Sequence, residues 1–268
     1  MNGDPVHYSR ALAMQGEFYS RQGEYDDALF CHELLKRTYD FEKHSALVVE
    51  AYASDRSAQN YGNAANCLYR LGRVEEAIEL SEEVLCDLIP RMDLKNVHSS
   101  MILLYPILWV WKNERMPKKA LSTLEQYVFE PFRMYFGAEG KTICLCLYKP
   151  LEVLFSILMY IEGEVEELDE TLLSWALEAD LSFSISMDNA MSNFALCCST
   201  ITAEICLLLS KHTNNDQVVR KRLIEKGWPL AQVAMETATK YGTHQSSYIM
   251  TKPIYDEIFQ LITELDEV

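Results

Sequence analysis

Cysteine and histidine are the residue types of this chain best suited to metal binding or nucleophilic chemistry, and the sequence holds eight of the first and six of the second. Zinc sites need ligand pairs at spacings such as C-x-x-C or H-x-x-x-H, and neither spacing occurs. Cys144 and Cys146 are two residues apart, which directs them to different faces of a helix, and Cys197 and Cys198 are adjacent. We interpret the cysteines as small, buried, reduced core residues, and we expect no metal site and no cofactor.

Catalysis by a nucleophile or by phosphate chemistry has no local signature either. Any thiol could meet His44 or His98 in the fold, but no surrounding motif marks a cysteine as activated. The phosphate-binding patterns G-x-x-x-x-G-K-[ST] and G-x-G-x-x-G do not occur. The sequence therefore predicts that the chain is not an enzyme, and no residue is assigned as catalytic. Enzymatic activity is the least favoured alternative.

The residues that do recur are those that position helices. Gly16 and Ala28 are small residues suited to a close crossing of two helices, with Tyr19 one turn after Gly16 to fill the space between them. Gly23 can take the positive φ of a helix C-cap, and Tyr25 opens the next helix. This spacing resembles the tetratricopeptide repeat (TPR) family, whose unit is about 34 residues. The resemblance implies an all-α, right-handed superhelical TPR-like solenoid of antiparallel helix pairs.

Three further copies of the spacing follow. The second is the clearest, and the third and fourth are fainter. Their residues are Ala65, Leu68, Gly72, Val74 and Ala77; Leu104, Leu108, Trp111, Pro117 and Ala120; and Ser156, Met159, Gly163, Val165 and Leu168. The pattern predicts repeats near 9–42, 58–91, 101–134 and 149–182. Helices within 187–268 are expected to cap the array, with an apolar helix at 193–211 covered by later ones.

The intervals between copies are 49, 43 and 48 residues, longer than the roughly 34 of the plain repeat. The extra stretches carry apolar residues at helical spacing, such as Leu47, Ala51 and Ala58, which predicts lengthened helices and hence a long-helix variant of the family. With only 10 glycines and 8 prolines, the chain has too few turn residues for an all-β fold. We expect about twelve helices in one elongated domain covering 1–268.

Charge and hydropathy restrict the environment and the partners. The net charge of −16 repels nucleic-acid phosphate and anionic lipid, and the short basic clusters Lys118–Lys119 and Arg220–Lys221–Arg222 are typical of solvated helix faces. The apolar run MILLYPILWVW is shorter than the roughly 20 residues that span a bilayer, and the first residues do not resemble a signal peptide. We therefore expect a cytoplasmic protein that binds neither nucleic acid nor membrane.

The TPR resemblance implies that an extended peptide binds in a concave groove lined by the first helix of each pair. Asparagine and glutamine side chains there could hydrogen-bond a peptide backbone, and Tyr105 with Trp109 could hold an apolar anchor, unless both are ordinary core residues. The basic residues of the carboxylate clamp found in chaperone-binding members do not match. The groove candidates are Arg10, Met14, Glu17 and Arg21; Gln59, Asn63, Asn66 and Arg70; and Tyr105, Trp109, Lys112 and Asn113.

The function expected from these residues is a protein–protein interaction scaffold that binds a peptide or partner segment in the concave groove. The acidic composition favours a basic partner. Two alternatives stay open: a regulatory helical module of a larger signalling protein, and a module that associates with itself.

Overall fold

The structure is a computed structural model that describes residues 5–52, 56–91, 97–130, 148–178, 192–212, 216–240 and 245–266. All regular structure in these residues is helical, with twelve α-helices and no strand. The expectation of an all-α fold is therefore confirmed for the described part of the chain. The chain divides into two units, Met1–Met116 and Pro117–Val268, which we describe separately. The expectation of one continuous repeat domain stays a prediction.

The first unit is a series of helices whose starts follow from local sequence. Pro5 opens the first helix, where its missing N–H costs nothing, and acidic residues lie in the first turns of the second and fifth helices, where the helix dipole favours them. The helices are α1 (Pro5–Gln22), α2 (Tyr25–Thr38), α3 (Phe41–Tyr52), α4 (Arg56–Arg70), α5 (Val74–Glu83) and α6 (Val97–Asn113), with a π-helical turn (Val84–Leu88) and a 3-10 turn (Ile89–Arg91) after α5.

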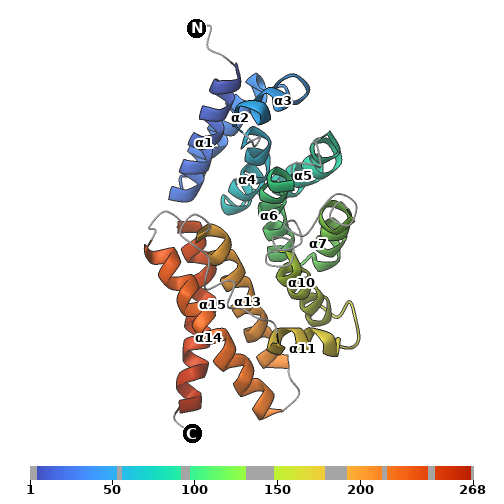
Figure 1. Cartoon of the computed structure of the whole chain (residues 1–268), viewed down its shortest axis with the longest axis vertical. Helices are drawn as coiled ribbons and strands as arrows, with labels where there is room; N and C mark the ends of the chain where they lie inside the picture. The colour runs from blue at the N-terminus through green and yellow to red at the C-terminus, as the bar shows by residue number, and fades with distance from the viewer. Residues whose placement is uncertain are drawn as a thin grey trace. The chain divides into compact units, whose positions relative to one another are not determined.

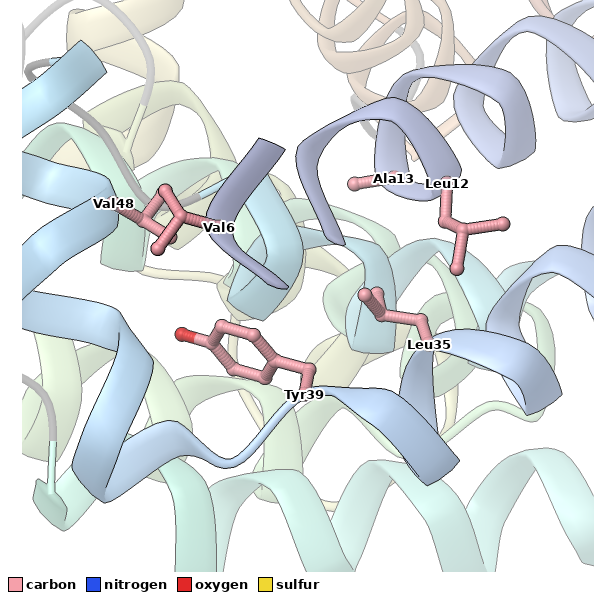
Figure 2. Packing of buried hydrophobic residues seen from close by; sticks show 6 residues of the cluster. All are labelled: Val6, Leu12, Ala13, Leu35, Tyr39 and Val48. Carbon is pink, nitrogen blue, oxygen red and sulfur yellow. The ribbon is translucent and has the colours of Figure 1, made fainter. Parts of the chain in front are cut away.

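Helix α4 is the centre of this unit. It lies between α1 and α6 and also packs against α2, α3 and α5, while α1 packs against α2 (Figure 1). A separate apolar cluster joins the N-terminal half of α1 to α2 and α3, and Figure 2 shows its side chains facing one another. The cluster consists of Val6, Leu12, Ala13, Leu35, Tyr39 and Val48.

The crossing of α1, α2 and α4 depends on a residue without a side chain. A Cβ atom at Gly16 would lie 3.2 Å from Asn60 Nδ2 and 3.3 Å from Cys31 Cβ, so only glycine fits without displacing these neighbours. His32 is buried at the same interface of α2 and α4, with its ring edge-on to Tyr61 at 4.8 Å between centroids. Burial lowers the pKa of His32 to about 4, helped by the charge of Lys36, so this imidazole is neutral in the fold at neutral pH.

Four turns in the described residues share one hydrogen-bond pattern, the Schellman motif that ends a helix. At the first, the Gly23 amide donates to the Ser20 carbonyl at 3.2 Å and the Glu24 amide donates to the Tyr19 carbonyl at 3.0 Å. Each turn is centred on a residue with positive φ, which confirms the C-cap expected at Gly23. These residues are Gly23 (φ 81°), Gly72 (φ 76°), Arg115 (φ 55°) and Gly163 (φ 74°).

The turns recur at the intervals of the sequence pattern, but the segments between them differ from the prediction of lengthened helices. After the first pair, α2 ends at Thr38, Tyr39 is extended, and a separate helix, α3, begins at Phe41. Asp40 starts this helix, because its carboxylate accepts a hydrogen bond from the Lys43 amide at 3.3 Å. The first interval therefore contains an added helix, and the prediction of a lengthened helix is wrong there.

The second interval and the fourth copy give contrasting outcomes. After α5 the helical path continues through the π turn and the 3-10 turn to Arg91, so this second helix is indeed extended. After Gly163, however, the next four residues form a bend and α11 begins only at Glu170. Val165 and Leu168, expected in a helix, lie outside it, and Val165 is exposed. The fourth copy therefore keeps the turn but not the helix that should follow directly.

The second unit packs around α13. This helix contacts α10, α11, α14 and α15, and α14 and α15 lie side by side along it (Figure 1). The described helices of the unit are α7 (Pro117–Leu124), α10 (Lys149–Ile161), α11 (Glu170–Glu178), α13 (Ser192–His212), α14 (Gln217–Lys240) and α15 (Gln245–Asp266), with a π-helical turn (Glu125–Phe129) after α7. The apolar helix expected at 193–211 is thus α13, and two later helices cover it.

Helix α13 is buried on nearly its whole circumference, and its close contact with α14 again requires a glycine. A Cβ at Gly227 would lie 3.0 Å from Cys206 Cβ, too close for both to stay in place. The hydroxyls of Thr200 and Thr251 meet at 3.1 Å between α13 and α15, which satisfies two buried polar groups. Within the described residues, no helix is both long and apolar enough to cross a membrane.

Candidate functional site

Helix α4 presents one polar stripe, and the rest of its circumference is packed against its neighbours. Residues 59, 63, 66 and 70 follow one another at steps of four, three and four, so they share one helix face. Asn63, Asn66 and Arg70 on this face are half-buried. The other faces carry small buried residues, which let the neighbouring helices approach closely; these are Ser57, Ala58, Asn60, Gly62, Ala64, Ala65 and Cys67, with Leu68. We call the surface formed by Asn63, Asn66 and Arg70 the α4 face; the side chain of Gln59, the fourth groove candidate on this helix, lies outside the described residues.

The two asparagine side chains of the α4 face are not engaged within the molecule. Neither Asn63 nor Asn66 makes a hydrogen bond or an ion pair in the described part of the chain. Each primary amide offers two N–H donors and one carbonyl acceptor, so it can donate to a peptide carbonyl and accept from a peptide N–H. The pair is therefore equipped to hold an extended backbone without reading its side chains.

Arg70, at the end of the α4 face, is close to Tyr25 at the start of α2. The Nε atom of Arg70 and the hydroxyl of Tyr25 are both buried without a hydrogen-bond partner in the structure. Burial raises the pKa of Tyr25, while the positive charge of Arg70 acts in the opposite direction. Burial also raises the pKa of the neighbouring Cys67 to about 11, so this thiol stays protonated.

The candidates on α1 form a partly exposed row. Met14 is 49% exposed, which is high for a methionine in a helix that packs on two sides. Glu17 and Arg21 are partly buried and form an ion pair one turn apart. Arg10 is half-buried. The α1 candidates thus combine one apolar side chain with a charge pair that is already satisfied.

The candidates on α6 are less open than the sequence suggests. Trp109 is only 7% exposed, so it belongs to the core, and Tyr105 is half-buried with its ring edge-on to Trp109 at 6.0 Å. The ammonium of Lys112 covers the Trp109 ring at 4.2 Å from its centroid, a cation–π contact. Asn113 is exposed. The two aromatic rings are therefore mainly packing residues of α6, and the accessible polar groups among the α6 candidates are Lys112 and Asn113.

The cysteines of the described residues are all free thiols. Cys31, Cys67, Cys198 and Cys206 are buried as expected, and Cys197 is half-buried. Cys86 is exposed, so the expectation of burial is wrong there: it lies on the solvent side of a π-helical turn whose Val84 and Leu85 are in the core. The pair Cys144 and Cys146 lies outside the described residues. In the part of the chain that the structure covers, no three histidine, cysteine or carboxylate side chains come together in a way that could hold a metal ion.

A second candidate region was missed by the sequence pattern. Three aromatic side chains, Trp228 of α14 with Tyr255 and Phe259 of α15, cluster beside a pocket lined by residues of both helices. Tyr255 and Phe259 are one helical turn apart and could have been noticed as an aromatic pair. Nothing in the sequence, however, places Trp228 next to them, because that requires α14 and α15 to pack side by side.

Comparison with known proteins adds no further constraint, since no protein-family model, curated protein or solved structure matches this chain.

Proposed function

We propose that the chain is a TPR-like helical solenoid that acts as a protein–protein interaction scaffold and binds an extended partner segment on the α4 face. The observation that carries this proposal is the pair Asn63 and Asn66, half-buried one turn apart on the central helix, whose side chains make no hydrogen bond in the described part of the chain. Neither side chain is among those with a buried polar atom that lacks a partner, so water can reach the amides and a ligand can take its place. A peptide backbone would supply hydrogen-bond partners, in the manner that the TPR resemblance implies.

The contacts of the neighbouring helices suit such a ligand. Helices α1 and α6 both pack against α4, and in the TPR register their groove candidates are expected to lie beside the α4 face. Met14 supplies exposed apolar surface on α1, and Lys112 and Asn113 supply polar groups on α6. The local charges, Arg70 and Lys112 among them, do not favour a basic segment. The preference for a basic partner inferred from the net charge therefore does not apply to this face, where a neutral or acidic segment fits better.

The proposal is tested by selecting peptides from a random library on the full chain and measuring their affinity by fluorescence anisotropy. Asn63→Ala with Asn66→Ala is the informative variant, because it removes the free amides and leaves the core intact. Trp109→Ala is unsuitable since Trp109 is buried. We expect the double variant to bind at least about tenfold more weakly, because hydrogen bonds contribute about 1 kcal/mol each.

The matched control is Gln126→Ala, which removes an exposed amide from the second unit. It is expected to bind the selected peptides like the unaltered chain. Equal affinities of the double variant and the unaltered chain, with both folded by circular dichroism, would contradict the proposal. Light scattering on the same samples checks the self-associating alternative, which requires a mass above 30.9 kDa.

A further inference from the structure

A pocket of about 450 Å³ lies between α14 and α15 in the second unit. Gln232, Met235, Glu236 and Thr239 of α14 line it together with Tyr255 of α15. The four α14 residues are spaced as one helix face, so the pocket follows the seam between the two helices. Its volume falls within the range of roughly 300–1,000 Å³ that is typical of sites for small ligands and single side chains.

Aromatic rings extend this pocket along the seam. The ring of Tyr255 lies 5.3 Å from that of Trp228 and 6.3 Å from that of Phe259, and Trp228 lies 5.6 Å from Phe259, all between centroids. Phe259 is 51% exposed, and Trp228 and Tyr255 are half-buried against the core formed with α13. Clustered exposed rings of this kind are typical of binding surfaces, because their exposure costs stability that a ligand can restore.

The charges around the pocket indicate which ligand it favours. Glu236 is exposed at the rim and forms no ion pair in the described residues. The nearest charges on α15 are already neutralised, Asp256 by Lys252 at 2.6 Å and Glu257 by Lys211 of α13 at 2.5 Å. Among the described residues that line the pocket, Glu236 is the one carboxylate and none is a cation, on a chain of net charge −16. A positive group would be attracted, and an anion would be repelled.

We propose that this pocket binds an arginine side chain of a partner segment. The aliphatic part of the arginine would contact Met235 and Tyr255, and the guanidinium would lie beside the aromatic rings and pair with Glu236. Arginine fits better than lysine because its planar group is weakly hydrated and stacks on aromatic faces. This site is distinct from the α4 face, and it is where the acidic chain would take a basic partner.

The test is a titration of the full chain with the peptide acetyl-Gly-Ala-Arg-Ala-Gly-amide, observed through the methyl signal of Met235 in ¹³C NMR. Met235→Leu assigns that signal. We expect a saturable shift with a dissociation constant near the millimolar range, since one exposed side chain contributes little affinity. Peptides with citrulline or leucine in place of arginine are expected to bind several-fold more weakly.

Two variants make the outcome specific. Glu236→Gln is expected to lower the affinity for the arginine peptide about fivefold and to leave the affinity for the citrulline peptide unchanged. The control is Glu225→Gln, which alters an exposed carboxylate elsewhere on α14 and should change neither affinity. Asn63→Ala with Asn66→Ala should also leave this binding unchanged, which separates it from the α4 face. A leucine peptide that binds as tightly as the arginine peptide, an unaltered affinity in Glu236→Gln, or no shift up to about 20 mM peptide would overturn the proposal.

Discussion

Helices α4 and α13 are each the central helix of their unit, packed by four or more neighbours. They differ in the residue types on the stripe that is not fully buried. Both are buried on most of their circumference. The remaining stripe of α4 is entirely polar, with Asn63, Asn66 and Arg70 half-buried and open. The corresponding stripe of α13 contains Cys197 and Leu208 around one charged residue, Glu204. The two stripes are similarly half-buried, so the difference lies in their chemistry: the α4 stripe offers hydrogen-bonding groups to a partner, whereas two of these three α13 residues are apolar.

The largest expected effect comes from placing a carboxylate on each central helix. Ala203 of α13 is fully buried, so Ala203→Asp would bury an unpaired charge or a strained neutral acid and should cost more than about 4 kcal/mol of the free energy of unfolding. Asn63→Asp on α4 keeps the side chain in contact with water and should change stability by no more than about 0.5 kcal/mol. Urea unfolding followed by circular dichroism measures both. Similar losses would remove the distinction between the two helices.

Mild acid should destabilise the first unit through His32. The unfolded imidazole has a pKa of about 6.5, and burial lowers the folded value to about 4. Between these values the unfolded chain binds a proton that the folded chain excludes, so stability falls as the pH falls from about 6.5 to 4 and levels off below, by on the order of 3 kcal/mol. In His32→Gln this fall in the free energy of unfolding should be absent.

The check is the difference between the pH profiles of unfolding of the unaltered chain and of His32→Gln. The described residues of the second unit contain no histidine as deeply buried, so a tryptophan reporter for that unit, Trp228, should show no matching step. Identical profiles for the two proteins would show that His32 is charged or accessible in the fold.

The glycine contacts of the two units can be compared directly. Gly227→Ala should destabilise by about 2 kcal/mol, because the added Cβ would lie 3.0 Å from Cys206 Cβ between two apolar helices. Gly16→Ala should cost about 1 kcal/mol, since the nearest atoms are 3.2 Å away at the end of the Asn60 side chain and can shift. Thermal or urea unfolding checks the order. Alanine has a higher helix propensity than glycine, which alone would stabilise both variants. A variant more stable than the unaltered chain would therefore contradict the close contacts at that glycine.

The smallest effect concerns the turn at which the second unit begins. Arg115 holds a positive φ of 55°, a conformation that glycine adopts without strain, so Arg115→Gly should stabilise the chain by about 0.5 kcal/mol. Gly72→Ala is the reverse experiment at an earlier turn of the first unit, to which Arg115 also belongs. Nothing lies within 4 Å of the added Cβ there, so the expected loss of about 1 kcal/mol reflects backbone strain alone. Unchanged unfolding midpoints in both would contradict this explanation.

The sequence predicted the helical fold and the register of the turns because both depend on short-range features. Gly23, Gly72 and Gly163 fall at the C-caps where their spacing places them. Arg115 could not be recognised as the equivalent position, because arginine rarely adopts a positive φ. The helical spacing of its apolar residues predicts α3 as a continuation of α2, whereas Asp40, a residue type that starts helices, indicates a new helix.

The candidate sites depend on tertiary packing and were predictable only in part. The spacing of Asn63, Asn66 and Arg70 in the sequence predicts that they share one polar face of α4. The burial of Trp109 is not, because it follows from the packing of α6 against α4 and from the position of Lys112 over the ring. The arginine pocket requires the side-by-side packing of α14 and α15, which no short-range pattern specifies.

The most direct test of the α4 face is photocrosslinking of a peptide selected on the full chain. p-Benzoylphenylalanine is introduced in turn at Met14 on α1 and at Asn113 on α6, which are exposed and which the proposal places beside the α4 face. Gln126 in the second unit, also exposed, is the control position. The first two positions are predicted to crosslink the peptide, with capture lost in the Asn63→Ala and Asn66→Ala background, and Gln126 is predicted not to crosslink. Equal crosslinking at Gln126, or capture that survives the loss of both asparagines, would contradict binding at the α4 face.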